Sequence, residues 1–163
     1  MEASESAGPG PMTPLHPAQL TVLRVRGAIA GVAILLIALA LDLGPLREAK
    51  LPTGLVTAIA AAVAAVLVLL LPGRRYRAWG YRETGDEIHI RHGVMVRVRT
   101  IVPFSRVQHT DVSQGPVERA CGVATLIVHT AGTRGAAVAL PGLAPAEAER
   151  MRDRIRARMG EPE

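Results

Sequence analysis

The sequence contains one cysteine, Cys121, and few aromatic residues. A single cysteine excludes an intramolecular disulfide and cannot supply the paired thiolates of a structural zinc site. Aromatic residues make up only 2% of the 163 residues, although 49% of the chain is hydrophobic. The apolar residues are mainly Ala, Val and Leu, and they gather between positions 27 and 71. This distribution is typical of membrane segments rather than of one large soluble core.

The motifs of common catalytic and nucleotide-binding sites are also missing. We find no phosphate-binding Gly loop, no nucleophile elbow and no carboxylate pair at a useful spacing. His89-x-x-His92 has a metal-like spacing, but it straddles a predicted hairpin turn, so two solvent-facing strand histidines are the favoured interpretation. We therefore expect a protein that is not an enzyme, with no catalytic residue, no metal and no cofactor.

Positive charge exceeds negative charge, with 19 Lys and Arg residues against 14 Asp and Glu residues and a net charge of +5. In a soluble protein this balance would raise the question of nucleic acid. Here several arginines stand beside the long apolar runs, so anionic lipid headgroups, and not nucleic acid, are the expected partner.

Two apolar runs predict a pair of membrane-spanning helices. The first run has 15 uncharged residues (27–41), which as a helix span about 22 Å. Arg24 and Arg26 can extend it by reaching the headgroups with their long side chains, which predicts a helix over 20–43. The second run has 23 uncharged residues (51–73) and spans about 34 Å. Pro72-Gly73 is expected to end it, so residues 20–73 form a helical hairpin in the bilayer.

The flanking charges predict the orientation of this hairpin. Five Lys and Arg residues lie at its outer ends and two lie in the connection, so both termini are expected on the cytoplasmic side of a bacterial cell membrane. Cleavage after a signal peptide at Ala38-Leu39-Ala40 is the alternative, but it would need a basic region of about 26 residues ahead of the apolar run. Residues 1–19 are rich in Pro, Gly, Ser and Ala and predict a disordered tail.

The region after position 75 shows the two-residue hydrophobic period of strands. Residues 87–91 place Ile88 and Ile90 inward, and His92-Gly93 predicts a hairpin turn into the next strand. In that strand, valines are expected on the half-buried face and mainly arginines on the other. The valines are Val94, Val96 and Val98, and the opposite face carries Met95, Arg97 and Arg99.

Further strands are predicted at 76–82, 107–113, 123–130 and 136–140, joined by short turns marked by Gly or Pro. This spacing predicts an antiparallel barrel or strongly bent sheet of about six or seven strands. Pro145 begins a predicted C-terminal helix over 145–159. One apolar stripe of this helix is formed by Ala144, Ala148, Met151, Ile155 and Met159. We expect this helix to cap the sheet, the alternative being a position on the membrane surface. The predicted fold class is a membrane α-helical hairpin followed by an α+β domain over 74–160.

Residues 113–126, SQGPVERACGVATL, predict a short helical turn between two strands. Pro116 suits the first helical position, and Gly122 suits the left-handed position that ends a helix. Cys121 and Val117 are four residues apart, so Cys121 is interpreted as a small apolar filler. A catalytic thiolate is the alternative, but Cys121 follows the C-terminal end of the turn, where the helix dipole disfavours negative charge.

The longer tract 101–132, IVPFSRVQHTDVSQGPVERACGVATLIVHTAG, resembles the central motif of the bacterial pleckstrin-homology-like membrane proteins, the YdbS-like group. The resemblance also covers Leu15-His16-Pro17, the helical hairpin and the hairpin over 81–93. The turn at the centre of the motif carries Gln114, Gly115, Pro116, Arg119 and Gly122.

The resemblance implies a pleckstrin-homology-type sheet capped by the C-terminal helix, in a membrane-anchored protein without established catalytic chemistry. It also implies a membrane protein partner, such as a larger relative with repeated copies of the domain. We therefore expect a scaffold or interaction module that acts in envelope maintenance or stress tolerance. The alternative is a sensor of anionic lipid headgroups that uses Arg91, Arg97 and Arg99, although these arginines could simply keep an exposed sheet face soluble.

Overall fold

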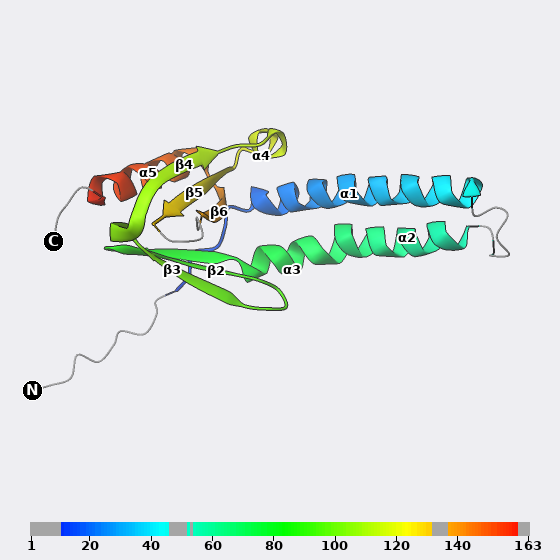
Figure 1. Ribbon diagram of the computed structural model, residues 1–163, viewed down its shortest axis with the longest axis horizontal. Coiled ribbons are helices and arrows are strands. Elements are labelled where there is room, and N and C mark those ends of the chain that lie inside the picture. Colours follow the sequence, from blue (N-terminus) through cyan, green and yellow to red (C-terminus); the bar gives the residue numbers. More distant parts are fainter. Residues whose placement is uncertain (1–10, 46–51, 53, 132–136, 160–163) are drawn as a thin grey trace, which may run out of the picture.

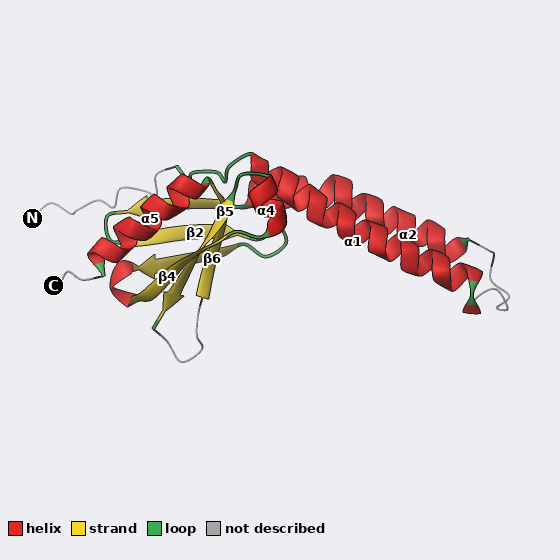
Figure 2. Ribbon diagram, turned by 90° about the horizontal axis from the view of Figure 1, so that it is seen from above, coloured by secondary structure: helices red, strands yellow, loops and turns green. Residues whose placement is uncertain are grey.

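The computed structural model describes residues 11–45, 52, 54–131 and 137–159. Two long helices leave one end of a smaller domain made of strands and short helices (Figure 1). The first helix, α1, spans Ala18–Leu43, and the second runs over residues 55–78. Both are long and apolar enough to cross a membrane, and only 17% of the most apolar window in each is buried. Figure 2, seen from above, shows the same two helices side by side along their whole length.

The second helix continues past Pro72, so its expected end at Pro72-Gly73 is wrong. It consists of α2 (Leu55–Ala65), a π-helical turn (Val66–Leu70) and α3 (Leu71–Ala78). Within the π turn the Leu71 N–H donates to the carbonyl of Val66, five residues back. A proline inside a regular helix clashes with the carbonyl four residues earlier. The wider π turn ahead of Pro72 relieves this conflict, and the helix carries Arg74, Arg75 and Arg77 beyond the apolar run.

Small residues let the two long helices pack closely. A Cβ atom added at Gly27 would lie 2.8 Å from the backbone oxygen of Leu67, and one at Gly31 would lie 3.3 Å from the Cβ of Ala64. Gly27 and Gly31 form a G-x-x-x-G pattern, which favours close helix contact in lipid. At the far end of the hairpin, the Asp42 carboxylate accepts hydrogen bonds from the Thr57 N–H at 2.8 Å and the Thr57 hydroxyl at 2.6 Å.

The N-terminal segment is part of the fold from residue 11, which corrects the expected tail over 1–19; residues 1–10 lie outside the described part. Thr13 forms an antiparallel bridge with Tyr81, at the edge of the first sheet. The Leu15 side chain is 2% exposed and belongs to the core. The His16 N–H donates to the Gly142 carbonyl at 2.7 Å. These contacts fix the start of α1 against the sheet domain.

The described strands form two three-stranded antiparallel sheets rather than one bent sheet. The first sheet orders β1 (Gly80–Thr84), β2 (Glu87–His92) and β3 (Val98–Pro103). The second orders β4 (Val107–Ser113), β5 (Ala124–Thr130) and β6 (Ala137–Leu143). A 3₁₀ turn, Phe104–Arg106, separates the sheets and buries Phe104 between them. β1 starts later than the expected strand at 76–82 because residues 76–78 still belong to α3.

The expected valine strand is also corrected. Residues 94–96 form a bend between β2 and β3 instead of strand, and their side chains are exposed. This part of the hairpin extends beyond the core, and none of the described elements covers it. Gly93 makes the turn possible: its φ is +104°, and a Cβ there would lie 1.9 Å from the Val96 oxygen.

One apolar core joins both sheets and the C-terminal helix α5 (Pro145–Arg158), which ends one residue before the expected bound and caps the sheets as predicted. Ala148, Met151 and Ile155 are the buried residues of α5, and they match the predicted stripe. The buried Tyr81 hydroxyl donates to the Glu147 carboxylate at 2.7 Å and so connects β1 to α5. Burial, followed by this carboxylate, raises the pKa of Tyr81 above its ordinary value.

Candidate functional site

Five arginines line one cavity where the sheet domain meets the second long helix. The cavity has a volume of about 360 Å³, and Ala78, Gly93 and Val94 complete its lining. We call it the arginine pocket, and its arginines are Arg74, Arg77, Arg91, Arg97 and Arg99.

Three elements supply these arginines. Arg74 and Arg77 are three residues apart on α3, so they share one face of the helix. Arg91 on β2 and Arg99 on β3 are direct partners in the antiparallel register, which places them on one face of the sheet. Arg97 comes from the loop between these strands. Figure 1 shows this loop beside α3, at the end of the domain from which the long helices leave.

The pocket has uncompensated positive charge. None of its arginines forms an ion pair with an acidic residue in the described part of the chain. Other arginines of the protein behave differently: Arg154 pairs with Glu83, and Arg158 pairs with Asp86. Like charges held this close repel one another, so the arrangement favours an anionic ligand that satisfies several guanidinium groups together.

An exposed apolar tip adjoins the pocket. Met95 is 97% exposed and Val96 is 74% exposed, while Val94 lines the pocket itself. Moving exposed apolar side chains out of water is favourable, so this tip would gain stability from an apolar surface that covers it. A pocket of arginines bordered by exposed apolar side chains matches the boundary between lipid headgroups and acyl chains.

The structure brings together Arg91, Arg97 and Arg99, which the sequence singled out, and adds Arg74 and Arg77. The two additional arginines were missed because Pro72-Gly73 was expected to end the helix. Only when residues 74–77 are helical do Arg74 and Arg77, three residues apart, share one face.

The turn of the family motif lies elsewhere, against α1. Its helix α4 spans Pro116–Ala120, with Pro116 at the first position and Gly122 at a φ of +68°, as predicted. The Gln114 amide donates to the Val123 carbonyl at 2.9 Å, and the Arg119 N–H donates to the Gly115 carbonyl at 2.8 Å. These bonds hold the turn in shape.

Glu118 is the residue of this turn that sequence reasoning missed. Its side chain is 7% exposed and pairs with Arg26 of α1 at 3.1 Å. It also accepts hydrogen bonds from the Gly115 N–H at 2.8 Å and the Thr125 hydroxyl at 3.3 Å. The turn therefore attaches the sheet domain to the first long helix.

Cys121 is of intermediate exposure and lies outside the core cluster, so its role as a small apolar filler stays a prediction. It occupies the C-cap of α4, and no histidine of the described residues hydrogen bonds to it. His89 lies beside Glu87, and His92 stacks on Trp79 with ring centroids 4.8 Å apart. These two histidines thus have separate contacts.

Comparison with known proteins identifies the family. The family model described as "Bacterial PH domain" matches residues 20–159, which includes both long helices and both sheets. The chain belongs to this family. It is also 41% identical over 90 residues to the UPF0699 transmembrane protein YdbS of Bacillus subtilis (strain 168).

The resemblance to YdbS-like bacterial PH-domain membrane proteins is thereby confirmed. The aligned part covers 55% of this chain and 55% of the length of the Bacillus subtilis relative. No solved structure matches the chain. A bacterial PH domain behind two apolar helices describes a membrane protein with transmembrane helices.

Proposed function

We propose that the arginine pocket binds the headgroup of an anionic lipid from the membrane that the helical hairpin spans. The observation that carries this proposal is the convergence of five arginines, without carboxylate partners among the described residues, beside the helix that leaves the membrane. Guanidinium groups bind phosphate through paired hydrogen bonds. Anionic headgroups lie at the level where α3 emerges from the apolar run, so the ligand reaches the pocket without leaving the bilayer.

The apolar tip supports the same proposal. Met95 and Val96 extend beside the pocket, and their exposure is compatible with insertion between headgroups. Burying these two side chains in the acyl region contributes a few kcal/mol in total, at about 1.5–3 kcal/mol for each large side chain. Arginines near the headgroups add about 1 kcal/mol each.

In this proposal the protein crosses the membrane twice, with the pocket on the cytoplasmic side. The excess of Lys and Arg at the outer ends of the hairpin supports that orientation. The role is non-enzymatic: the domain senses or organises lipids rather than converting them. Fusion of a reporter to the C-terminus, active only on one side of the membrane, tests the orientation directly.

Lipid binding is tested with the full chain in a mild detergent. Short-chain phosphatidylglycerol is titrated, and bound lipid is measured by native mass spectrometry. Removing two pocket charges in Arg91→Gln/Arg99→Gln should weaken binding at least tenfold, because each arginine contributes about 1 kcal/mol. The matched control is Arg150→Gln/Arg156→Gln on the exposed side of α5, which removes the same charge.

The control should bind like the unmodified chain, and zwitterionic phosphatidylcholine should bind weakly to all three proteins. Equal losses in the pocket variant and the control would show that net charge alone attracts the lipid. Unchanged binding in the pocket variant would contradict the proposal.

The second candidate function is interaction with a membrane protein partner, as a scaffold in envelope maintenance or stress tolerance. A cavity of about 530 Å³ on the outer side of the first sheet favours it, with Met12, Ile101 and His89 among the residues that line it. A larger relative with repeated PH-like domains is the partner that we propose for this surface. Ile101 is 55% exposed, so Ile101→Arg should abolish co-purification of such a partner without unfolding the chain. Arg74→Gln/Arg77→Gln should keep it, because Arg74 and Arg77 line the arginine pocket and not this cavity, whereas Arg91 and Arg99 line both.

A further inference from the structure

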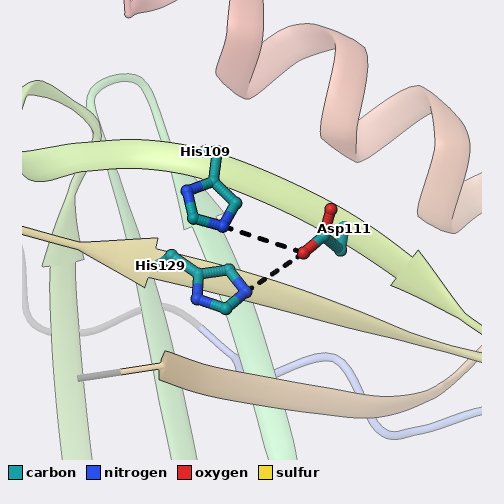
Figure 3. Close-up of side chains that lie close together, drawn as sticks. All are labelled: His109, Asp111 and His129. Carbon is teal, nitrogen blue, oxygen red and sulfur yellow. Dashed lines mark ion pairs between the residues drawn. The ribbon is translucent and has the colours of Figure 1, made fainter. Parts of the chain in front are cut away.

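Two histidines and one aspartate gather on the outer face of the second sheet, away from the arginine pocket. His109 on β4 lies directly opposite His129 on β5 in the antiparallel register. Asp111 is two residues beyond His109 on the same strand, so it points to the same face. Figure 3 shows the three side chains converging over the two strands.

The geometry of this group is close to that of a metal site. Nε2 of His129 lies 3.1 Å from Oδ2 of Asp111, and Nε2 of His109 lies 3.8 Å from the same oxygen. The three possible ligand atoms all lie within 4.8 Å of one another. A tetrahedral zinc ion with bonds of about 2.0–2.1 Å holds its ligand atoms about 3.3 Å apart. The longest separation between ligand atoms would therefore have to shorten by about 1.5 Å to close the site, a change that side-chain rotations can supply.

The arrangement is incomplete without a further group. The carboxylate is within hydrogen-bond distance of His129, but the distance of 3.8 Å to His109 is too long for a hydrogen bond. The two imidazole rings are stacked, with centroids 4.0 Å apart and planes 14° apart. Two protonated rings would repel each other at this distance, whereas two neutral rings present lone pairs to a cation.

We propose that His109, Asp111 and His129 bind a divalent transition metal ion of the zinc type. Two imidazole nitrogens and one carboxylate oxygen suit zinc and its first-row neighbours, while magnesium and calcium prefer sites made only of oxygen. His109 and Asp111 are each 60% exposed, so the remaining coordination position faces solvent. Water, or a donor group of another molecule, completes the coordination there. The ligands are held by paired strands, and a backbone already ordered keeps the entropic cost of binding low.

The spacing in the sequence conceals this site. His109 and Asp111 are close along the chain, but His129 joins them only through the pairing of β4 with β5. The site belongs to the opposite sheet from the arginine pocket, so it is independent of the proposed lipid binding.

The test uses the full chain in detergent, purified with a tag that contains no histidine. Zinc chloride is titrated by calorimetry, and cobalt(II) is added separately to record the visible absorption of a coordinated ion. The unmodified chain should bind one zinc ion and give a cobalt spectrum that zinc abolishes. His109→Ala, His129→Ala and Asp111→Asn should each weaken zinc binding at least tenfold and remove the cobalt spectrum.

His89→Ala is the matched control, because His89 also lies beside a carboxylate on a strand, but no second histidine of the described residues pairs with that carboxylate. It should bind zinc like the unmodified chain. Zinc should also raise the melting temperature of the unmodified chain and of His89→Ala, because a ligand that binds only the folded state stabilises it. It should not raise the melting temperature of the three site variants.

The proposal is overturned if the unmodified chain binds no zinc at one equivalent. It is equally overturned if His109→Ala and His129→Ala keep the full affinity, since the ion would then lie elsewhere. Each site variant is also melted without zinc. A variant that melts at the same temperature as the unmodified chain but binds no zinc is folded, so its loss of binding comes from the missing metal-binding side chain.

Discussion

Arg26 in the first long helix and Glu118 in the turn after β4 form an ion pair at 3.1 Å, although 92 residues separate them in the sequence. Glu118 also accepts hydrogen bonds from Gly115 and Thr125, so one carboxylate connects the helix, the turn and β5. The turn that begins at Pro116 and ends at Gly122 thus has a definite structural role: it presents a buried carboxylate to the first long helix.

Replacing Glu118 should loosen this junction. Glu118→Ala removes the acceptor of three charge-assisted bonds and should cost about 2 kcal/mol of unfolding free energy. Arg26→Gln should cost less than about 1 kcal/mol, since the Arg26 side chain is 54% exposed and water can replace the pair. Thermal unfolding of the full chain in detergent measures both values. Equal melting temperatures for Glu118→Ala and the unmodified chain would show that the Glu118 carboxylate does not stabilise the junction.

The two long helices should separate when a side chain is placed at Gly27. A Cβ there would lie 2.8 Å from the Leu67 oxygen, which belongs to the backbone and cannot rotate away. Gly27→Ala should therefore destabilise the hairpin by about 1–3 kcal/mol. Gly73→Ala is the control, because no atom lies within 4 Å of its Cβ position. Alanine favours a helix over glycine by about 1 kcal/mol, so the control should be neutral or more stable. The stabilities are compared by unfolding in detergent, and similar effects of both substitutions would contradict the close packing.

The apolar tip should contact the bilayer. Cys121→Ser frees the chain of its single cysteine, so that Met95→Cys can carry an environment-sensitive fluorophore. In nanodiscs of anionic lipid, the emission of this fluorophore should lie at shorter wavelength than in nanodiscs of neutral lipid. The reason is that anionic headgroups bound in the pocket bring the tip into the membrane interface. Ser105→Cys, exposed on the 3₁₀ turn between the sheets, should show no such shift. An unshifted spectrum at position 95 would place the tip in water.

Stability should fall at alkaline pH through Tyr81. Burial raises the pKa of its hydroxyl, so the folded chain retains the proton at a pH where the unfolded chain, with a tyrosine pKa of about 10, releases it. The stabilising contribution is complete below about pH 10 and is lost as the pH rises above that value. Tyr81→Phe should melt lower near neutral pH, because the bond to Glu147 is gone, and should show a weaker alkaline decline.

Melting temperatures measured between pH 7 and pH 11 provide the comparison. Tyr76→Phe serves as the control: it loses the hydrogen bond to the Leu15 carbonyl but keeps Tyr81 in place. The control should retain the full alkaline decline. If Tyr81→Phe declines as steeply as the control, other groups cause the loss of stability.

Sequence periodicity predicted the structure correctly where a residue pattern is compatible with one kind of element. The apolar runs predicted two long helices, the alternation in β2 placed Ile88 and Ile90 in the core, and the stripe of α5 predicted its buried face. Pro116 and Gly122 predicted the turn α4 because their dihedral preferences act locally. The resemblance of residues 101–132 predicted the family, and the family match confirms it.

Periodicity misled where a neighbouring element decides burial. The alternating valines at 94–98 predicted a half-buried strand, yet none of the elements in the described part of the chain packs on that end of the hairpin, so Val96 is exposed. Pro72 reads as a helix end, but a π turn allows the helix to continue. In both cases the residue preference is real, but the neighbouring elements decide the structure that forms.

The sequence alone was enough to predict two apolar helices long enough to cross a membrane and an antiparallel sheet domain, because hydrophobic period and turn chemistry are properties of neighbouring residues. The tertiary structure alone decided which charges meet. Strand pairing put Arg91 beside Arg99 and His109 beside His129, and the continued helix added Arg74 and Arg77 to the pocket. Residues distant in the chain form a site only after folding fixes the distance between them, and no local pattern encodes that distance.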